Sequence, residues 1–407
     1  MQETVKGDRL HIALFGRRNA GKSSLINALT GQEIALVSDI AGTTTDPVYK
    51  AMELLPVGPV MFIDTAGIDD EGELGALRVE RTLQVLNKTD LALLVIDPAI
   101  GAGNEERRLA EAVRHRKIPL LAVVNKADRY RVEPEKLDAW TAWLGSVTVV
   151  SAASGAGIEK LKQAIIQAAP DDWEGQPLIG DLLRPGDTVV MVVPIDLAAP
   201  KGRLILPQVQ AIRDALDHDS ICVVTKEQEL RRALDNLKQP PRLVVTDSQA
   251  FAKVAGDTPP DVWLTSFSIL MARHKGDLAT LAAGAKAIDS LLPGDAVLVA
   301  EGCSHHRQAD DIGRVKIPRW LRQRVGGELR FQWVSGGDFP SDLSSYRLIV
   351  HCGSCMLNRR QMLYRLSLAR EQQVPIVNYG VLIAWLQGIL PRALLPFPLA
   401  ASLFAKS

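Results

Sequence analysis

The sequence predicts an α/β protein of several domains, and three observations indicate this fold class. Apolar runs of about five residues, typical of buried parallel strands, alternate along the chain with stretches that have helical spacing. The first apolar run leads into Gly16-Arg17-Arg18-Asn19-Ala20-Gly21-Lys22-Ser23, which matches the G-x-x-x-x-G-K-S pattern of a phosphate-binding loop. Residues 170–177, PDDWEGQP, break the alternation and predict a linker.

Length and charge narrow the range of functions. At 407 residues the chain is too long for one ordinary core, so two or three domains are expected. Its 47 basic and 47 acidic residues balance, so no overall field draws it to nucleic acid or anionic lipid. It has no run of about 18 uncharged apolar residues and no apolar segment near its first residue. We expect a cytoplasmic protein with neither nucleic acid nor membrane as a partner.

The phosphate-binding loop lies between a predicted strand, residues 10–15, and a predicted helix that opens with SLINAL. Its glycines, Gly16 and Gly21, allow the backbone N–H groups to point inward at a phosphate chain. Lys22 is expected to place its charge on the β- and γ-phosphates, and the Ser23 hydroxyl is the expected magnesium ligand. Ser24 completes the expected phosphate-binding set.

A second phosphate-side loop follows the predicted strand at residues 60–63. The strand ends at Asp64-Thr65-Ala66-Gly67. An aspartate at this place can hold magnesium through water, and the N–H of Gly67 can donate to a γ-phosphate. Asp64 and Gly67 are therefore expected to act on the same phosphates as the first loop.

Two later loops carry groups that suit a guanine base. The loop after residues 120–124 holds Asn125-Lys126-Ala127-Asp128, in which the carboxylate can accept both N–H groups of guanine's Watson–Crick edge. Adenine cannot satisfy that arrangement. The loop after residues 147–150 begins with Ser151 and Ala152 and is expected to close over the base. Since all four loops lie at strand ends, we expect a parallel, doubly wound sheet.

These motifs make residues 10 to about 168 resemble the TrmE–Era group of translation-factor-like GTPases. The resemblance implies GTP, GDP and Mg²⁺ as ligands and GTP hydrolysis as the activity. Residues 38–46, SDIAGTTTD, look like that group's switch I, in which Thr44 would bind magnesium in the GTP state. Ile68 stands where Ras-like enzymes have a glutamine, so the group that orients the attacking water stays open. The expected catalytic set is Lys22, Thr44, Asp64 and Gly67.

A potassium site is also implied by this resemblance. Asn19 matches the asparagine that helps to bind K⁺ in potassium-activated members of the group. A monovalent cation beside the phosphates could supply the electrostatic effect of an arginine finger. The backbone carbonyls that would complete the site are those of Ser38, Ile40 and Thr43.

Residues 171–270 are expected to form a second, small α/β domain. The segment has no phosphate loop and no acid–base pair, so we interpret it as a dimerisation domain. Cys222 lies inside an apolar run and is expected to be a packed core thiol. Asp196 is either a turn residue or a group that reaches a neighbouring domain. The predicted strands lie within residues 188–195, 221–225, 242–246 and 262–266.

Residues 271–407 hold three of the four cysteines. Predicted strands end at Cys303-Ser304-His305-His306 and at His351-Cys352-Gly353-Ser354-Cys355, where α/β sheets place ligand sites. A helix is expected to open at Cys355 and to point its N-terminal dipole at the thiols. This spacing is typical of a zinc or an iron–sulfur site, and inert buried thiols are the alternative.

The pattern C-x-H, 45 residues, H-C-x-x-C behind a TrmE-like GTPase domain resembles HydF, the family of maturation GTPases of iron-only (FeFe) hydrogenases. The resemblance spans nearly the whole chain. It implies a 4Fe–4S cluster ligated by Cys303, Cys352 and Cys355, with one iron left to a weaker or exchangeable ligand. The candidates for that ligand are His305, His306, His351 and Asp196, and a supporting role near the cluster is the alternative for His305 and His351.

The resemblance also implies the protein's role and partners. It would be a scaffold and carrier that holds the cluster and a di-iron precursor and delivers the precursor to apo FeFe-hydrogenase. Radical-SAM maturases that build the di-iron unit would be further partners, and the chain would form a homodimer or a larger oligomer. The expected domains are a P-loop GTPase domain at residues 1–170, a dimerisation domain at 171–270 and an iron–sulfur cluster-binding domain at 271–407.

Two other readings of the sequence stay open. One is a TrmE/Era-like, RNA-related GTPase with a structural zinc site, although no basic patch or RNA-binding module is evident. The other is a redox enzyme in which the cluster transfers electrons, although no flavin or nicotinamide motif is present.

Overall fold

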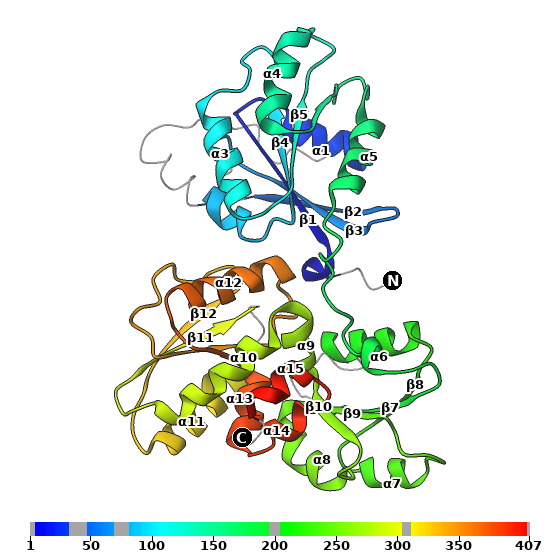
Figure 1. The fold of residues 1–407 in the computed structure, drawn as a ribbon, viewed down its shortest axis with the longest axis vertical. Helices are drawn as coiled ribbons and strands as arrows, with labels where there is room; N and C mark the ends of the chain where they lie inside the picture. Colours follow the sequence, from blue (N-terminus) through cyan, green and yellow to red (C-terminus); the bar gives the residue numbers. More distant parts are fainter. Residues whose placement is uncertain (1–4, 32–46, 69–80, 195–203, 303–310, 405–407) are drawn as a thin grey trace. The chain divides into compact units, whose positions relative to one another are not determined.

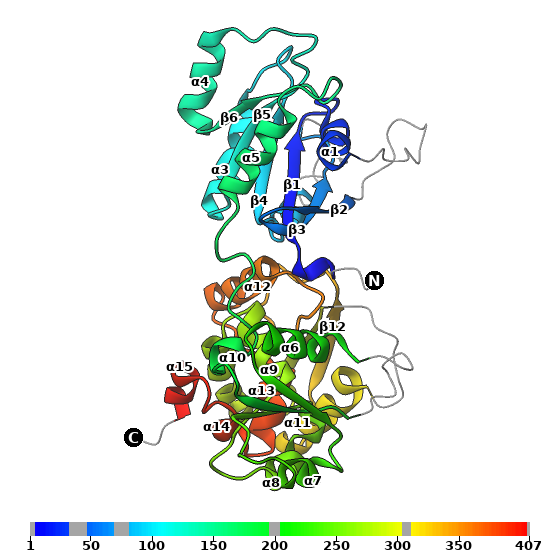
Figure 2. The same cartoon turned by 90° about the vertical axis from the view of Figure 1, so that its right-hand side faces the viewer.

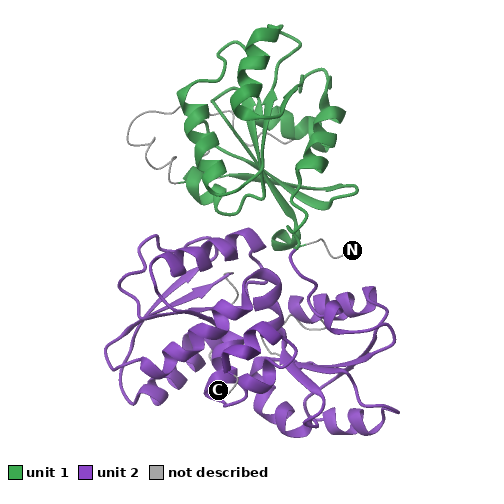
Figure 3. Ribbon diagram, in the orientation of Figure 1, with its two compact units in different colours: residues 1–174 green, residues 175–407 purple. Residues whose placement is uncertain are grey.

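The structure is a computed structural model, and it describes residues 5–31, 47–68, 81–194, 204–302 and 311–404. The chain divides into two compact units, Met1–Glu174 and Gly175–Ser407 (Figure 3). Each unit is described by itself. The second unit contains two separate sheets. The domain boundaries expected near residues 170 and 270 stay predictions.

The first unit is built on one six-stranded sheet, in the order β2-β3-β1-β4-β5-β6. Four of its five parallel strands, namely β1, β3, β5 and β6, end at the loops that the sequence singled out. An antiparallel edge strand, β2 (Val48–Leu54), pairs with β3. The expectation of a wholly parallel sheet is therefore wrong at this edge. The parallel strands are β1 (Leu10–Gly16), β3 (Gly58–Asp64), β4 (Leu91–Ile96), β5 (Leu120–Val124) and β6 (Val147–Val149).

Helices cover both faces of this sheet (Figures 1 and 2). On one face α1 (Lys22–Thr30) and α5 (Ile158–Ala168) pack against apolar side chains of β1, β3 and β4. On the other face α3 (Asn104–His115) and α4 (Pro134–Leu144) cover the alternate side chains of the same strands. Because the sheet is buried on both sides, its central strands are continuous apolar runs, which made them recognisable in the sequence.

The second unit holds two parallel four-stranded sheets, in the orders β10-β9-β7-β8 and β12-β11-β13-β14. Every neighbouring pair in them is parallel. The strands of the first are β7 (Thr188–Val192), β8 (Ile221–Thr225), β9 (Leu243–Thr246) and β10 (Trp263–Ser266). Those of the second are β11 (Ala296–Glu301), β12 (Arg330–Ser335), β13 (Leu348–His351) and β14 (Ile376–Asn378).

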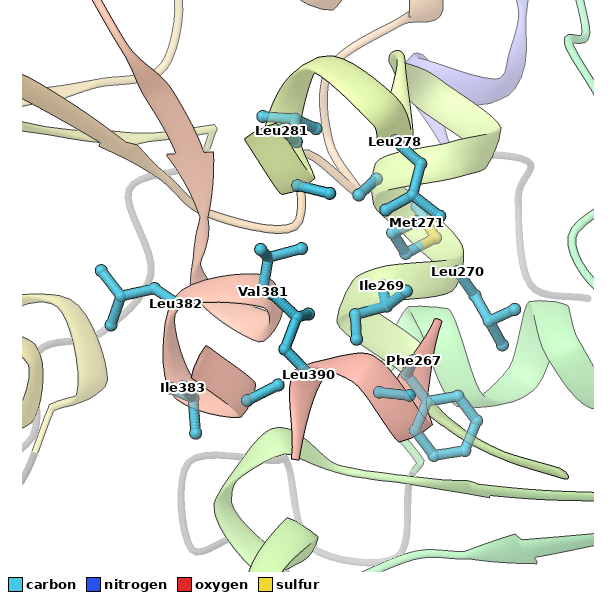
Figure 4. Close-up of a cluster of buried hydrophobic side chains, with 14 of the residues drawn as sticks. Phe267, Ile269, Leu270, Met271, Leu278, Leu281, Val381, Leu382, Ile383 and Leu390 are labelled. Carbon is cyan, nitrogen blue, oxygen red and sulfur yellow. The ribbon is translucent and has the colours of Figure 1, made fainter. Parts of the chain in front are cut away.

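Three helices lie between these two sheets in Figure 1: α9 (Phe267–Lys275), α10 (Leu278–Gly284) and α13 (Tyr379–Leu386). Figure 4 shows their buried side chains meeting, with Ile269 and Met271 of α9 near Leu278 of α10 and Val381 of α13. One continuous apolar core runs through both sheets. The remaining helices are α6 (Leu206–Asp217), α7 (Leu230–Asp235), α8 (Phe251–Asp257), α11 (Ile317–Val325), α12 (Arg359–Glu371), α14 (Leu390–Ala393) and α15 (Pro398–Ala401).

The short helix α10 is followed directly by a 3₁₀ segment, Ala285–Ser290. The helix expected to open at Cys355 begins instead at Arg359, because Asn358 accepts a hydrogen bond from the N–H of Gln361 at 3.1 Å and caps it. Within the described residues, no helix has the length and apolar character needed to cross a membrane.

Candidate functional site

The phosphate-binding loop connects β1, all of whose residues are buried, to α1. The Lys22 ammonium is largely buried and donates to the carbonyls of Gly16 and Arg17, both at 3.0 Å. Asn19 has a left-handed backbone with φ of 61°, and Gly21 has φ of 89°. The loop therefore curls around the Lys22 head group, as expected for a phosphate cradle.

Asp64 ends β3 beside this loop, and its register partner across the sheet is Leu14 of β1. Its carboxylate accepts a hydrogen bond from the Ser23 hydroxyl. The other carboxylate oxygen, Oδ1, is buried and has no hydrogen-bond partner in the described part of the chain. Burial raises the pKa of Asp64, and the Ser23 hydroxyl and the Lys22 charge offset only part of that rise. A hydroxyl and an orphaned carboxylate oxygen at this place fit a Mg²⁺ ion.

The base-side residues lie at the carboxyl ends of β5 and β6. The Asn125 amide nitrogen donates to the Ala20 carbonyl at 3.1 Å, and its oxygen accepts from the N–H of Ala152 at 3.0 Å. One buried side chain thus ties the phosphate loop to the loop that begins at Ser151. Asp128 accepts from the Ser151 hydroxyl at 2.6 Å, and that bond lowers the pKa of Asp128.

Two further contacts lie at the nucleotide loops, one made by Lys126 and one by the residue after Gly67. The Lys126 ammonium pairs with the Asp97 carboxylate at 2.6 Å, which joins the ends of β4 and β5. The residue after Gly67, Ile68, donates its N–H to the Gly16 carbonyl at 3.3 Å. Ser24 is exposed on the first turn of α1. The predicted residues Ser38, Ile40, Thr43, Thr44, Asp196, Cys303, His305 and His306 lie outside the described residues.

One ion pair of the loop was not predicted. The Arg17 guanidinium binds the Glu106 carboxylate through Nε at 2.7 Å and Nη2 at 3.1 Å. Glu106 is buried in the first turn of α3 and also accepts from the N–H of Gly103. Burial opposes its ionisation, but the bonds from Arg17 and Gly103 outweigh burial and lower the pKa of Glu106. Since 89 positions separate the partners, no local sequence signal could reveal the pair.

The second candidate site is the loop between β13 and α12. The Cys352 sulfur accepts hydrogen bonds from the N–H groups of Gly302, at 2.9 Å, and Ser354, at 3.4 Å. Gly302 directly precedes Cys303 in the chain. The fold thus brings the residue next to the first cysteine run against the second run. Backbone N–H groups that point at a sulfur favour a thiolate, which is the form that ligates metals.

His351 is fully buried at the end of β13. Its Nε2 lies 2.8 Å from Nη1 of Arg365, and its Nδ1 lies 3.0 Å from the Cys352 carbonyl and 3.1 Å from the Ser354 hydroxyl. Burial, together with the Arg365 charge, lowers the pKa of His351 to about 3, so the ring is neutral. Arg365 was not predicted, because its place in α12 reads as one more surface charge.

Tyr379 and Glu301 lie near the same loop. The Tyr379 hydroxyl is 3.5 Å from a carboxylate oxygen of Glu301, which ends β11 and is buried. Burial raises the pKa of Tyr379, and the negative charges around it add to that rise. Among the described residues no group of three or more His, Cys, Asp and Glu side chains could hold a metal ion. Cys352 and Cys355 are the described thiols of the expected site, and thiols in a C-x-x-C loop fit an iron–sulfur cluster.

Three segments of the chain match known protein families. Residues 11–126 match the family described as 50S ribosome-binding GTPase. Residues 178–276 match the hydrogen maturase F dimerization domain, and residues 279–396 match the hydrogen maturase F tetramerization domain.

Two curated proteins are similar to this chain over less than half of its length. The tRNA modification GTPase MnmE of Nitrosomonas europaea is 36% identical over 42% of this chain and 36% of its own length. The GTPase Der of Kosmotoga olearia is 34% identical over 40% of this chain and 39% of its own length. The chain thus spans less than two fifths of these curated relatives. A crystal structure of Era from Aquifex aeolicus is 20% identical over 61% of this chain and 99% of that chain, with a TM-score of 0.37.

The fold and the nucleotide loops define a protein with an N-terminal P-loop GTPase domain and two further α/β sheets. The chain belongs to the hydrogen maturase F family, since that family's two domains match consecutive segments of its second unit. The predicted resemblance to HydF and to TrmE–Era GTPases is confirmed. The matched domains are oligomerisation domains, and the last of them carries the cysteine loop.

Proposed function

We propose that the protein is a GTP-hydrolysing maturation factor of FeFe-hydrogenase, which holds a 4Fe–4S cluster and hands a di-iron cargo to the apo-enzyme. The observation that carries this proposal is the contact between Gly302 and the Cys352 sulfur, behind a P-loop GTPase domain. Apo FeFe-hydrogenase and the radical-SAM maturases that build the di-iron unit are the partners this role requires.

GTP hydrolysis would take place at the first site. Lys22 and the loop N–H groups would hold the phosphates, and Ser23, Asp64 and Thr44 would hold Mg²⁺. Asp128 would accept the guanine N–H groups. Asn19 and the carbonyls of Ser38, Ile40 and Thr43 would hold K⁺, whose charge would stabilise the transition state. Hydrolysis should therefore be slow in sodium and faster in potassium, and equal rates in the two salts would remove the K⁺ assignment.

The cluster would be held at the second site by Cys303, Cys352 and Cys355. With three thiolates, a bound 4Fe–4S cluster would offer one iron with an exchangeable ligand, as attachment of a di-iron cargo requires. Cys352 receives two backbone N–H groups, and such bonds stabilise thiolate ligands and tune the cluster. His305 and Asp196 stay candidates for the fourth ligand.

Assembly would use the edge strand β8 of the dimerisation domain. β8 pairs with β7 at one side and is the end strand of its sheet as described. Ile221 and Val224 of β8 are 56% and 48% exposed, and Leu216 of the neighbouring α6 is 55% exposed. Apolar side chains on an open strand edge favour pairing with a second copy of the chain.

Anaerobic reconstitution with iron and sulfide tests the cluster assignment. The full-length protein should bind about four irons per chain and give a 4Fe–4S EPR signal on reduction. Cys352→Ala and Cys303→Ala should each remove most of the signal. Cys222→Ala is the matched control, since Cys222 is a partly buried thiol of β8 that contacts the Ile212 carbonyl, and it should retain the signal. Colourless protein with one zinc per chain would refute the proposal.

A further inference from the structure

Arg365 is the largest fully buried side chain of the described structure and is 1% exposed. It comes from α12, whose first residue follows the cysteine loop after a short turn. Its Nη1 donates to His351, and its Nη2 donates to the Gly336 carbonyl at 2.6 Å. The ring of Phe339 lies under the guanidinium at 4.9 Å. Arg365 is thus held on several sides directly behind the cysteine loop.

The contact with Arg365 decides which nitrogen of His351 carries the proton. A guanidinium can only donate, so Nε2 of His351 must accept from Nη1. The neutral ring then carries its proton on Nδ1, which donates to the Cys352 carbonyl. Arg365, His351 and the backbone of Cys352 form one chain of hydrogen bonds. The Nε2 atom of His351 already has a partner.

Two groups act electrostatically on the Arg365 guanidinium from a distance, the Cys352 sulfur and the Asp338 carboxylate. Among the described residues neither forms an ion pair with it, and its Nε is buried without a hydrogen-bond partner. A buried cation without an anion in direct contact is costly. A cluster ligated by three thiolates is net negative, and Cys352 is the nearest candidate thiolate. The unpaired guanidinium therefore fits an anionic group at the cysteine loop.

We infer that Arg365 is a positioning residue of the cysteine loop: it orients His351 as a support for Cys352, and its charge stabilises the reduced form of the bound cluster. His351 is then a hydrogen-bonding support and not the fourth ligand. The inference rests on the proposed iron–sulfur site. It predicts that the buried cation makes the reduction potential of the bound cluster higher than the thiolate ligands alone would make it.

The test compares Arg365→Met and Arg365→Lys with Arg392→Met in the full-length protein. Arg392 is a matched control on α14: its Nη atoms donate to the carbonyls of Ala255, Thr258 and Pro259, and its Nε is likewise buried without a partner. Each variant is reconstituted, its iron counted, and its cluster titrated by EPR. Thermal unfolding of each apo-protein gives the purely structural cost.

Arg365→Met should lower the equilibrium constant for cluster reduction at least tenfold. For a one-electron couple this corresponds to a reduction potential lower by about 59 mV. Arg365→Lys keeps the positive charge, so its cluster should have a reduction potential close to that of wild type. Arg392→Met should lose thermal stability but keep the wild-type potential. If Arg365→Met does not fold, the Lys variant and the tautomer measurement decide. A wild-type potential in Arg365→Met, or equal shifts in Arg365→Met and Arg392→Met, would overturn the inference.

A readout on apo-protein does not depend on the cluster. Nitrogen NMR of the His351 ring should show the proton on Nδ1 in wild type and a mixture of tautomers in Arg365→Met, which has no donor for Nε2. A wild-type ring with its proton on Nε2 would contradict the orienting role. Different results would refute the two proposals. Wild-type protein that binds no iron would refute the cluster site. A wild-type cluster whose reduction potential does not change when Arg365 is substituted would refute only this inference.

Discussion

The imidazole Nδ1 of His274 lies 2.7 Å from the carbonyl oxygen of Gln176. His274 is near the end of α9, and Gln176 belongs to the segment by which the chain enters the second unit. Arg359, the first residue of α12, donates to the carbonyls of His274, at 3.4 Å, and Gly276, at 3.2 Å. The entering segment, α9 and the helix after the cysteine loop are therefore bonded at one place.

Arg359→Ala should loosen the entering segment. The variant loses two bonds from a charged donor, each worth about 1.5 kcal/mol and about 3 kcal/mol together, so residues 170–177 should open about 100-fold more often. Limited proteolysis with mass spectrometry should show correspondingly faster cleavage there. Arg370→Ala, on the exposed last turn of the same helix, is the control and should cleave at the wild-type rate. Equal rates in both variants would mean that Arg359 does not hold the segment.

Asp64→Asn should stabilise the first unit at pH 7 while impairing hydrolysis. Burial raises the folded-state pKa of Asp64 above the unfolded value of 3.8. The stability linked to its proton is thus present below pH 3.8 and lost as pH rises through the folded pKa. Asparagine cannot ionise, so the variant should gain on the order of 0.5–2 kcal/mol at pH 7 without magnesium or nucleotide.

The gain of Asp64→Asn should shrink as the pH falls through the raised folded-state pKa of the carboxyl, and it should vanish below pH 3.8, where the wild-type carboxyl is protonated in both the folded and the unfolded state. Denaturant unfolding at several pH values measures it. Asp138→Asn, at an exposed position on α4, is the control and should keep the wild-type stability at pH 7 within about 0.5 kcal/mol. A variant less stable than wild type at pH 7 would show that the Ser23 bond outweighs burial.

Gly21→Ala should damage the nucleotide site more than Gly31→Ala. Both glycines have left-handed backbones, with φ of 89° and 64°, so each substitution costs about 1 kcal/mol in strain. An added Cβ at Gly21 would lie 2.3 Å from Nδ2 of Asn125, whereas at Gly31 it would meet nothing within 4 Å. Only Gly21→Ala should therefore displace Asn125 and weaken binding of a fluorescent GDP analogue, by roughly tenfold or more. Equal affinities would argue against the Asn125 contact.

Val224→Lys should disrupt assembly through β8. In a two-fold interface the same edge meets its own copy, so the substitution would bring like charges together and weaken association about 100-fold or more. Sedimentation velocity should show a shift towards smaller species. Leu292→Lys, which changes a residue 66% exposed outside the strands of this unit, is the control. An unchanged oligomer would place the interface elsewhere.

The buried strands and the nucleotide loops could be predicted because their signal is local. β1, β4 and β5 are continuous apolar runs, and the loop after each lies at a known offset. The edge strands β2 and β12 were missed, because each alternates exposed and partly buried residues and includes charged ones. Such strands are stabilised by one neighbour and by turns, and their composition resembles that of loops.

The cysteine site could be predicted only in part. The spacing of Cys352 and Cys355 identified the loop, but the support behind it depends on contacts between distant segments. The bond from Gly302 to Cys352 spans 50 positions, and the one from Arg365 to His351 joins a helix to a strand end. A buried arginine in an amphipathic stretch cannot be told from an exposed one by its sequence, because burial is a property of the packed fold.

The apolar core of the second unit runs without interruption from Leu178 to Ala400, across the boundary between the two matched domains. Helix α9 ends the first of these domains, yet it packs on α10, α12 and α13 of the second. A chain cut near residue 277 would expose apolar surface on both fragments, so neither should fold by itself. We expect calorimetry to show the two sheets melting in a single cooperative transition. Any strain that assembly imposes on β8 would then act on the same cooperative folding unit that contains the cysteine loop.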